Sequence, residues 1–186
     1  MRVLLLLIVL SLTTAKLSLA QDSLKFKNES TAGFLFGINR LGPSFQHYTG
    51  VVLEKYHIEA GIVLGFDQYE YFNINPVGIA LKTPLFKGKK IDTILGFNTG
   101  LGFYLFQTKG PEDKYQPQLF THPNLSFRFG KLRKVNFTVN AGYKMQKAKT
   151  IVIGGQNNGS WWPIAPSKTV SEYKLQRLVV STGISF

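Results

Sequence analysis

The stretch of residues 91–106 alternates between two kinds of side chain along its whole length. Its odd-numbered positions are apolar or threonine: Ile91, Thr93, Leu95, Phe97, Thr99, Leu101, Phe103 and Leu105. Its even-numbered positions are mostly small or polar: Asp92, Ile94, Gly96, Asn98, Gly100, Gly102, Tyr104 and Phe106. A period of two is typical of a β-strand. The run is also much longer than the usual soluble strand of about 5 to 6 residues.

A long strand with one apolar face suits a lipid bilayer. The hydrocarbon core is about 30 Å thick, and roughly 9 to 11 strand residues tilted near 45° cross it. In hydrocarbon every backbone N–H and C=O group must be paired, so such strands are stable only in a closed barrel. The stretch therefore predicts companion strands with the same alternation.

The rest of the chain contains such companions, after a polar leader over residues 21–30. Alternation or apolar runs predict further strands over residues 31–40, 48–56, 57–66, 74–86, 118–130, 135–146 and 173–186. Short basic links are expected at residues 55–57, 87–90 and 131–134, and longer links at 41–44, 67–73, 107–115 and 154–170. In bacterial outer-membrane barrels, short turns face the periplasm and long loops face outward. The pattern predicts an all-β fold, an antiparallel up-and-down transmembrane β-barrel of about eight strands.

Residues 1–20 have the pattern of a cleavable signal peptide. Arg2 provides a charged start, residues 3–12 are almost wholly apolar, and Ala20 supplies the small residue that precedes a cleavage site. A membrane-anchoring helix is the alternative, but the apolar core is too short to span and Lys16 interrupts its end. We expect cleavage after Ala20, export of the chain and a single barrel domain over residues 21–186.

The charge balance limits the partners of the exported chain. Without Arg2 and Lys16, the 22 basic residues become 20 against 10 acidic ones, a formal charge of about +10. Because an exported protein rarely meets nucleic acid, anionic lipid headgroups are the expected counterpart. The chain has no cysteine, so neither disulfides nor a lipid-modified cysteine can contribute. Membrane attachment must therefore come from the fold.

Four segments resemble a known family. They are residues 76–89, residues 100–103, residues 136–146 and the terminal run 180–186. The chain is similar there to the small outer-membrane β-barrel proteins of Bacteroidetes, often described as porin family or outer-membrane β-barrel domain. The resemblance implies a Gram-negative outer membrane as the location, outer-membrane lipids as neighbours, and recognition of the last strand, ending at Phe186, by the barrel-assembly machinery. It says little about activity, and it identifies no extracellular partner.

Charged residues are predicted to fill the barrel interior. A barrel of about eight strands is packed by its own side chains, so we expect no open pore. Inward polar groups must then satisfy one another, and Gly96, Asn98, Gly100 and Gly102 would leave room for larger groups such as Arg128 and Lys144. The candidates for this ionic network are Glu54, Glu59, Lys82, Asp92, Arg128, Lys144 and Arg177. A narrow ion path or proton relay is the functional alternative, but both signs of charge occur, which favours packing.

Catalytic chemistry has one weak candidate. His122 and Ser126 share the inward face of a predicted strand, which could pair a base with a hydroxyl. A lipid-modifying barrel enzyme would need its groups to face the lipid, so we expect no enzyme, no cofactor and no metal site. His47 and His57 lack metal-ligand spacing.

Two alternatives concern the outside of the barrel. Trp161 and Trp162 could contact a partner or glycan, or could belong to an aromatic girdle at the membrane interface. A secreted, soluble, lipocalin-like ligand binder would also have about eight strands, but with its apolar face inward. The small inward residues, the strand lengths and Phe186 favour the membrane protein, for which we expect a structural or surface-interaction role.

Overall fold

The structure, a computed structural model, describes residues 24–37, 40–69, 73–105, 113–132, 135–154 and 167–186. The strands in these ranges are β1 (Leu24–Gly37), β2 (Arg40–Leu53), β3 (Ile58–Gln68), β4 (Asn73–Lys87), β5 (Ile91–Phe103), β6 (Asp113–Gln116), β7 (Gln118–Leu132), β8 (Val135–Gly154) and β9 (Ser167–Ser185). A short 3-10 turn, η1 (Glu54–Tyr56), links β2 to β3. No helix in the described ranges is long and apolar enough to cross a membrane.

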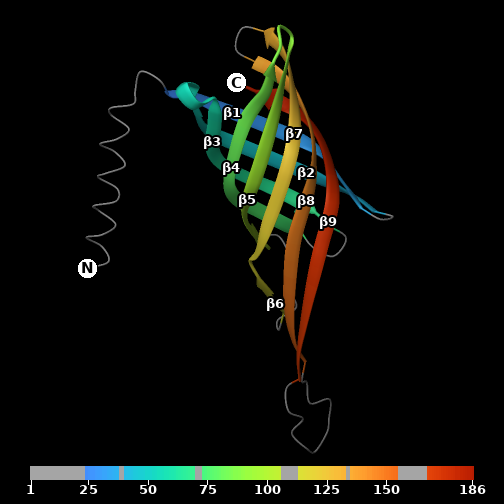
Figure 1. The fold of residues 1–186 in the computed structure, drawn as a ribbon. Helices are drawn as coiled ribbons and strands as arrows, with labels where there is room; N and C mark the ends of the chain where they lie inside the picture. Colours follow the sequence, from blue (N-terminus) through green and yellow to red (C-terminus); the bar gives the residue numbers. More distant parts are fainter. Residues whose placement is uncertain (1–23, 38–39, 70–72, 106–112, 133–134, 155–166) are drawn as a thin grey trace, which may run out of the picture.

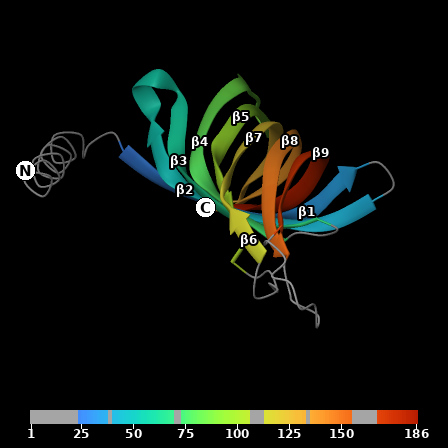
Figure 2. The ribbon, with the colours of Figure 1, turned by 90° about the horizontal axis from the view of Figure 1, so that it is seen from below.

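Eight of the strands form a closed antiparallel barrel. All strands except β6 pair in chain order, and β1 then pairs with β9, from Glu29 opposite Ser185 to Phe36 opposite Leu178. β1 and β9 lie next to each other when the molecule is seen from below (Figure 2). At this seam Asn28 N–H donates to the Phe186 carbonyl at 2.8 Å, and Phe186 N–H donates back at 2.9 Å. The predicted eight-stranded up-and-down barrel is confirmed.

The barrel is apolar outside and polar inside. In β5, Phe97 is 45% exposed whereas its neighbour Asn98 is 5% exposed. In β3, Ile62 is 53% exposed whereas Val63 is 3% exposed. Because successive strand side chains point to opposite faces, each strand places most of its large apolar residues outward, while a few, such as Leu35, Ile74 and Phe120, pack inside. The alternation predicted for these strands is therefore confirmed.

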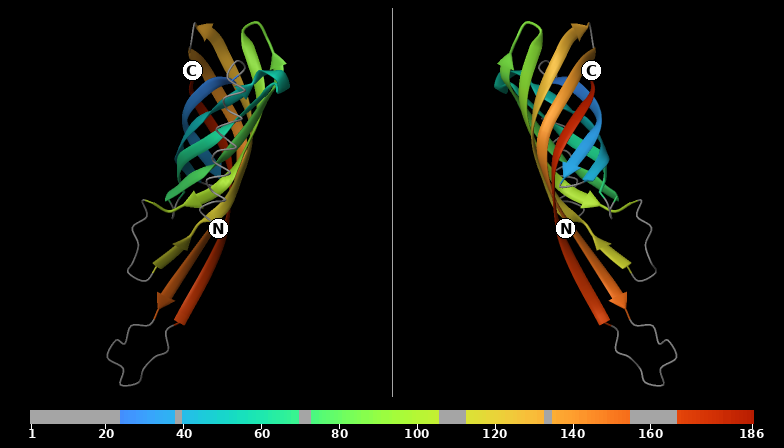
Figure 3. Two further views of the ribbon diagram at one scale, coloured as in Figure 1. Left: turned by 90° about the vertical axis from the view of Figure 1, so that its left-hand side faces the viewer. Right: turned by 90° about the vertical axis from the view of Figure 1, so that its right-hand side faces the viewer.

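The two ends of the barrel differ. η1, the β4–β5 turn and Phe186 lie together at one end, which we call the short-turn end (Figure 1). There, Gly88 N–H donates to the Ile91 carbonyl at 3.0 Å, and His57 closes η1 in the left-handed region with φ 53°. At the opposite end, which we call the long-loop end, β8 and β9 continue beyond the other barrel strands as an arm, and β6 pairs with β8 along part of it (Figures 1 and 3).

The first hairpin differs from the prediction. Residues 41–44 were expected to form a loop and residues 21–30 a polar leader, but β2 begins at Arg40 and β1 at Leu24. Pro43 is tolerated in β2 because the β3 pairing begins only at Ser44, which leaves Pro43 paired with β1 alone. Gly42 is needed for close approach, since a Cβ there would lie 2.0 Å from the Gln68 carbonyl oxygen.

The arm is a second difference. The predicted seventh strand ended at Gln146, but β8 continues to Gly154 and pairs with β9 down to Gly154 opposite Ser167. Residues 150–153 are threonine, isoleucine and valine, which favour extended backbone. The predicted irregular link 107–115 also contains the start of β6, which pairs with the other edge of β8.

Candidate functional site

Near the short-turn end, four strands bring five charged side chains together inside the barrel. We call Lys27, Glu29, Glu59, Lys82 and Arg128 the ionic cluster. Lys27 Nζ lies 3.0 Å from Glu59 Oε1, and Lys82 Nζ lies 3.0 Å from Glu29 Oε1. Arg128 joins the two carboxylates, because its Nη1 lies 3.1 Å from Glu59 Oε1 and its Nη2 lies 3.4 Å from Glu29 Oε2. The cluster therefore ties β1, β3, β4 and β7 together.

A second ionic pair lies toward the long-loop end. Lys144 of β8 forms an ion pair with Asp67 of β3, and both side chains are 0% exposed. Ser44 Oγ donates to Asp67 Oδ1 at 2.6 Å, and the Lys144 ammonium lies 5.2 Å from the centre of the Phe120 ring. A buried charge is costly unless it is paired and hydrogen-bonded. Each member of this pair therefore depends on the other.

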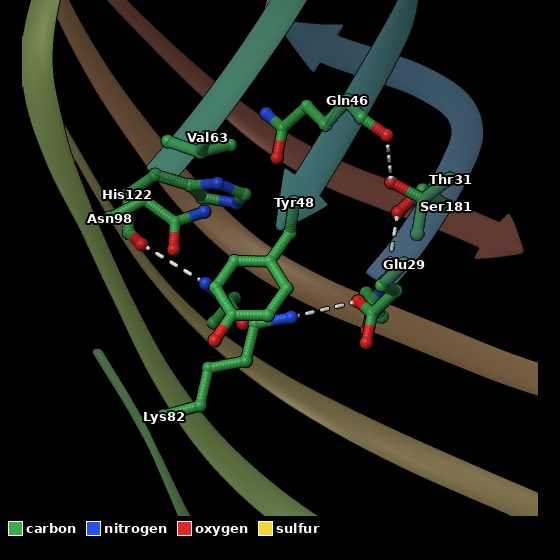
Figure 4. A pocket seen from close by; sticks show the side chains of 11 residues that line it. Glu29, Thr31, Gln46, Tyr48, Val63, Lys82, Asn98, His122 and Ser181 are labelled. Atoms are coloured by element: carbon green, nitrogen blue, oxygen red, sulfur yellow. Dashed lines mark hydrogen bonds and ion pairs between the residues drawn. The ribbon is translucent and has the colours of Figure 1, made fainter. Parts of the chain in front are cut away.

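Between the barrel ends, the free interior space narrows to a small cavity. It has a volume of about 20 Å³ and is lined by residues that include Tyr48, Asn98, His122 and Asn140. Figure 4 shows Tyr48, Lys82 and His122 projecting into this space from different strands. Both His122 ring nitrogens and the side-chain oxygens of Asn98 and Asn140 have no hydrogen-bond partner among the described residues. A space of this size and polarity suits a single water molecule.

The cavities at the two ends are wider. A cavity of about 290 Å³ at the short-turn end is lined by residues that include His57, Asp92 and Arg128. A cavity of about 410 Å³ at the long-loop end is lined by residues that include Tyr69 and Arg177. Among the described residues, the cavities at the two ends are thus larger than the one between them.

The seven predicted network residues are divided among different places. Glu59, Lys82 and Arg128 meet in the ionic cluster, and Lys144 pairs with Asp67 instead. Asp92 lines the short-turn cavity beside Arg128 without an ion pair in the described part of the chain. Arg177 lies 5.8 Å from the Tyr69 ring centre and donates to the Gln176 carbonyl.

Glu54 was predicted to join the interior network, but it lies apart from the ionic cluster, at the wall of the short-turn cavity. It lies in η1, its side chain is 51% exposed, and it pairs with Lys25 at 2.6 Å. The reason is that β2 ends at Leu53, so the strand alternation no longer determines where residue 54 points.

Sequence reasoning missed three charged members of the interior. Lys27 and Glu29 were assigned to a leader before the first strand, and Asp67 to the start of a loop. The sequence did contain this information. Residues 27 and 29 are odd-numbered like the inward-facing Leu35, and alternate residues of one strand point to the same face.

The remaining predicted sites have mixed outcomes. Trp161 and Trp162 lie outside the described residues, so the predicted loop contacts stay a prediction. Phe186 lies at the barrel seam with its side chain 52% exposed. His122 and Ser126 do not form the pair that a hydrolase would need, since Ser126 Oγ hydrogen-bonds Asn124 Oδ1 at 3.4 Å. Within the described ranges, no group of three acidic or histidine residues could hold a metal ion.

No protein-family model matches the chain, and no curated protein matches it in sequence.

Solved structures do match the fold. The chain is similar to Neisserial surface protein A, with a TM-score of 0.56 and 9% identity over 87% of this chain and 95% of that one. It is similar to the outer membrane protein OprG from Pseudomonas aeruginosa, with a TM-score of 0.53 and 12% identity over 88% of this chain and 94% of that one. The outer membrane protein AlkL, solved in lipid bilayers, has a TM-score of 0.52 and 11% identity over 88% and 87%. At these identities the likeness shows a shared fold, the small antiparallel β-barrel.

Proposed function

We propose that this chain is an integral outer-membrane β-barrel protein with a structural or surface-interaction role. The observation that carries the proposal is the inverted burial: Lys144 and Asp67 are 0% exposed, while Ile79 on the outside is 59% exposed. A soluble barrel of lipocalin type would bury the isoleucine and expose the lysine. Hydrocarbon around the barrel removes the cost of the exposed apolar face.

The outward apolar face extends around the ring. Every strand of the barrel contributes exposed large apolar side chains, among them Phe34, Phe45, Ile62, Ile79, Phe97, Leu119, Phe137 and Leu178. Monomeric soluble proteins rarely expose contiguous apolar patches larger than a few hundred Å². The names of two similar structures, OprG and AlkL, describe outer membrane proteins, which supports the same location for this chain.

The interior of the proposed protein is filled and does not conduct. The ionic cluster and the Asp67–Lys144 pair occupy it from opposite ends, and the space between them is about 20 Å³. A role in contact with partners then belongs to the long-loop end, where β8 and β9 lead into the segment that holds the predicted contacts Trp161 and Trp162.

The two ends of the chain have proposed roles in biogenesis. Residues 1–20 direct export and are removed, so the mature protein begins at Gln21. The terminal strand, ending at Phe186, is read by the barrel-assembly machinery, as in the Bacteroidetes-type barrels that the sequence resembles. Mass measurement of the purified protein tests the cleavage, and deletion of Phe186 with recovery of the folded fraction tests the assembly signal.

Separation of cell envelopes tests the location. The proposal expects the full-length protein, expressed in a Gram-negative host, in the outer-membrane fraction after a carbonate wash, and soluble only with detergent. Its unboiled band should migrate apart from its boiled band, because a closed barrel resists unfolding by detergent. Recovery in the soluble periplasmic fraction without detergent would overturn the proposal.

A further inference from the structure

Two lysines face each other on the outside of the arm. Lys147 of β8 and Lys174 of β9 are directly opposite partners in the ladder, and both are exposed. Like charges at opposite positions destabilise a sheet. The adjacent outward pair, Lys149 and Glu172, carries opposite charges, and its charged groups form an ion pair at 2.9 Å. Within the described part of the chain no acidic group forms an ion pair with Lys147 or Lys174, although the charge of Lys147 also acts on Glu172. Lys147, Lys149 and Lys174 against Glu172 leave a net charge of about +2 at this site.

An apolar groove adjoins this lysine pair. The groove has a volume of about 200 Å³, and it is lined by Leu119 of β7, Met145 and Lys147 of β8, and Lys174 of β9. Leu175 of β9, which packs against the interior, closes its inner side. Leu119 is 52% exposed and Met145 is 42% exposed, so the groove is reached from outside the barrel.

The groove lies where one edge of β8 changes its pairing partner from β7 to β6. Pairing of β7 with β8 ends at Phe120 opposite Gln146, and β6 pairs with β8 only from Lys149. Gln146 covers this gap, because its Nε2 donates to the Gln118 carbonyl at 3.2 Å and to the Lys147 carbonyl at 2.9 Å. The gap in the ladder is thus closed by a side chain, which leaves Leu119 beside the two lysines.

The site lies at the edge of the outward apolar face. Tyr143 and Leu178, opposite partners nearer the barrel centre, are 42% and 50% exposed. Four residues further along the same two strands, the opposite partners change from the apolar Tyr143 and Leu178 to the two lysines Lys147 and Lys174. A ligand that fits must have an apolar chain and an anionic head at one end.

We propose that the groove and the lysine pair bind a phosphorylated lipid of the surrounding leaflet. The phosphate accepts hydrogen bonds from Lys147 and Lys174, and one acyl chain lies along Leu119 and Met145. This inference rests on the proposed function, since only a membrane-embedded barrel presents this face to lipid. The phosphate removes the repulsion between the two ammonium groups, and the lysine stems stay on the apolar surface.

Native mass spectrometry of the folded, detergent-solubilised protein tests the site. The probes are dioleoyl phosphatidic acid and dioleoyl phosphatidylcholine, which share their acyl chains. We expect tighter binding of phosphatidic acid, and roughly tenfold weaker binding in the K147Q/K174Q variant, because each lysine contributes an attraction to anionic headgroups. Binding of phosphatidylcholine should weaken less, because its choline group offsets the charge of its phosphate. The matched control, K55Q/K89Q, removes two exposed lysines at the short-turn end and should bind as the parent protein does.

A second variant separates the groove from the charge. Met145→Trp fills the groove and keeps both lysines, so it should weaken phosphatidic acid binding and leave binding of inorganic phosphate unchanged. Equal losses in K147Q/K174Q and K55Q/K89Q would overturn the proposal in favour of general charge attraction. Complete displacement of the lipid by equimolar inorganic phosphate would overturn it in favour of a simple anion site. Envelope separation of the same variants distinguishes failure of this site from failure of the proposed membrane location.

Discussion

The buried Asp67–Lys144 pair is the strictest local requirement in the interior. Both side chains are fully buried, and Ser44 satisfies a further lone pair of the carboxylate. Removing one partner of a buried pair costs about 3 to 5 kcal/mol because an uncompensated charge remains, whereas replacing both partners costs much less.

Lys144→Met is therefore expected to lower the free energy of unfolding by about 3 to 5 kcal/mol. The double variant Asp67→Asn/Lys144→Met should recover most of this loss, because the stranded carboxylate is gone. Urea unfolding of the barrel in lipid vesicles, followed by electrophoretic mobility, measures both. Equal stability of the Lys144→Met variant and the parent protein would show that Lys144 and Asp67 do not form a buried ion pair in the membrane-embedded barrel.

Glu54 offers a titration at the short-turn end. The hydrogen bond from Lys25 and the charge of the same lysine lower the pKa of the Glu54 carboxyl. Because its folded-state pKa is lowered, the pair stabilises the fold above the ordinary glutamate pKa, and this contribution is lost as pH falls through the lowered value. Lys25→Met should return the Glu54 pKa toward its ordinary value, and Lys89→Met should leave it in place. Carboxyl ¹³C shifts against pH measure the difference.

At the scale of single elements, the alternation of residues predicted a strand and its faces correctly wherever the two faces differed in polarity. β5 was predicted with the right start and the right faces, because Phe97 and Leu101 alternate with glycine and asparagine. The small inward residues of β5 do make room, but not for Arg128 and Lys144. Cβ atoms at Gly96 and Gly102 would meet Asn124 and Gln146.

Strand ends were harder to predict, because they depend on pairing partners distant in sequence. Residues 24–30 are polar and look like a leader, yet β2 pairs with them from Leu24 opposite Leu53 to Ser30 opposite His47. Likewise, Asp113–Gln116 forms a strand only because the extended β8 offers an unpaired edge. The ionic cluster inherits this difficulty, since Lys27 and Glu29 lie in the part of β1 taken for a leader.

The depth of an outward residue determines the cost of placing a charge there. Phe97→Arg, near the middle of β5, should cost about 2 to 4 kcal/mol of unfolding free energy, because the guanidinium would lie near the bilayer midplane. Phe26→Arg, near the start of β1, should cost about 0 to 1 kcal/mol. Reversible unfolding from lipid vesicles measures both values. Equal costs at the two positions would contradict a barrel that crosses the bilayer.

At the scale of the whole molecule, the cavities at the two ends of the barrel are larger than the one between them. The cavities of about 410 Å³ and 290 Å³ at the ends are separated by the polar constriction that includes Tyr48 and His122. In planar bilayers the parent protein should therefore show no steady ion conductance. Tyr48→Ala/His122→Ala should produce discrete conductance steps, because it widens the constriction. Steady conductance of the parent protein would refute the filled interior.

The central claim is that the apolar face of this barrel contacts lipid. The chain has no cysteine, so single cysteines placed one at a time at Leu95, Phe97, Asn98, Thr99 and Leu101 give clean spin-label sites. In bilayers, collisions with dissolved oxygen should speed the spin relaxation of labels at Leu95, Phe97, Thr99 and Leu101. A water-soluble nickel complex should have little effect on the relaxation of the same labels. The label at Asn98 should show the lower oxygen accessibility of a packed interior; Gly96 and Gly100 stay unlabelled, because an added Cβ there would meet Asn124 and the Val77 carbonyl. Ready access of the nickel complex to the odd-numbered positions would contradict the membrane-spanning barrel.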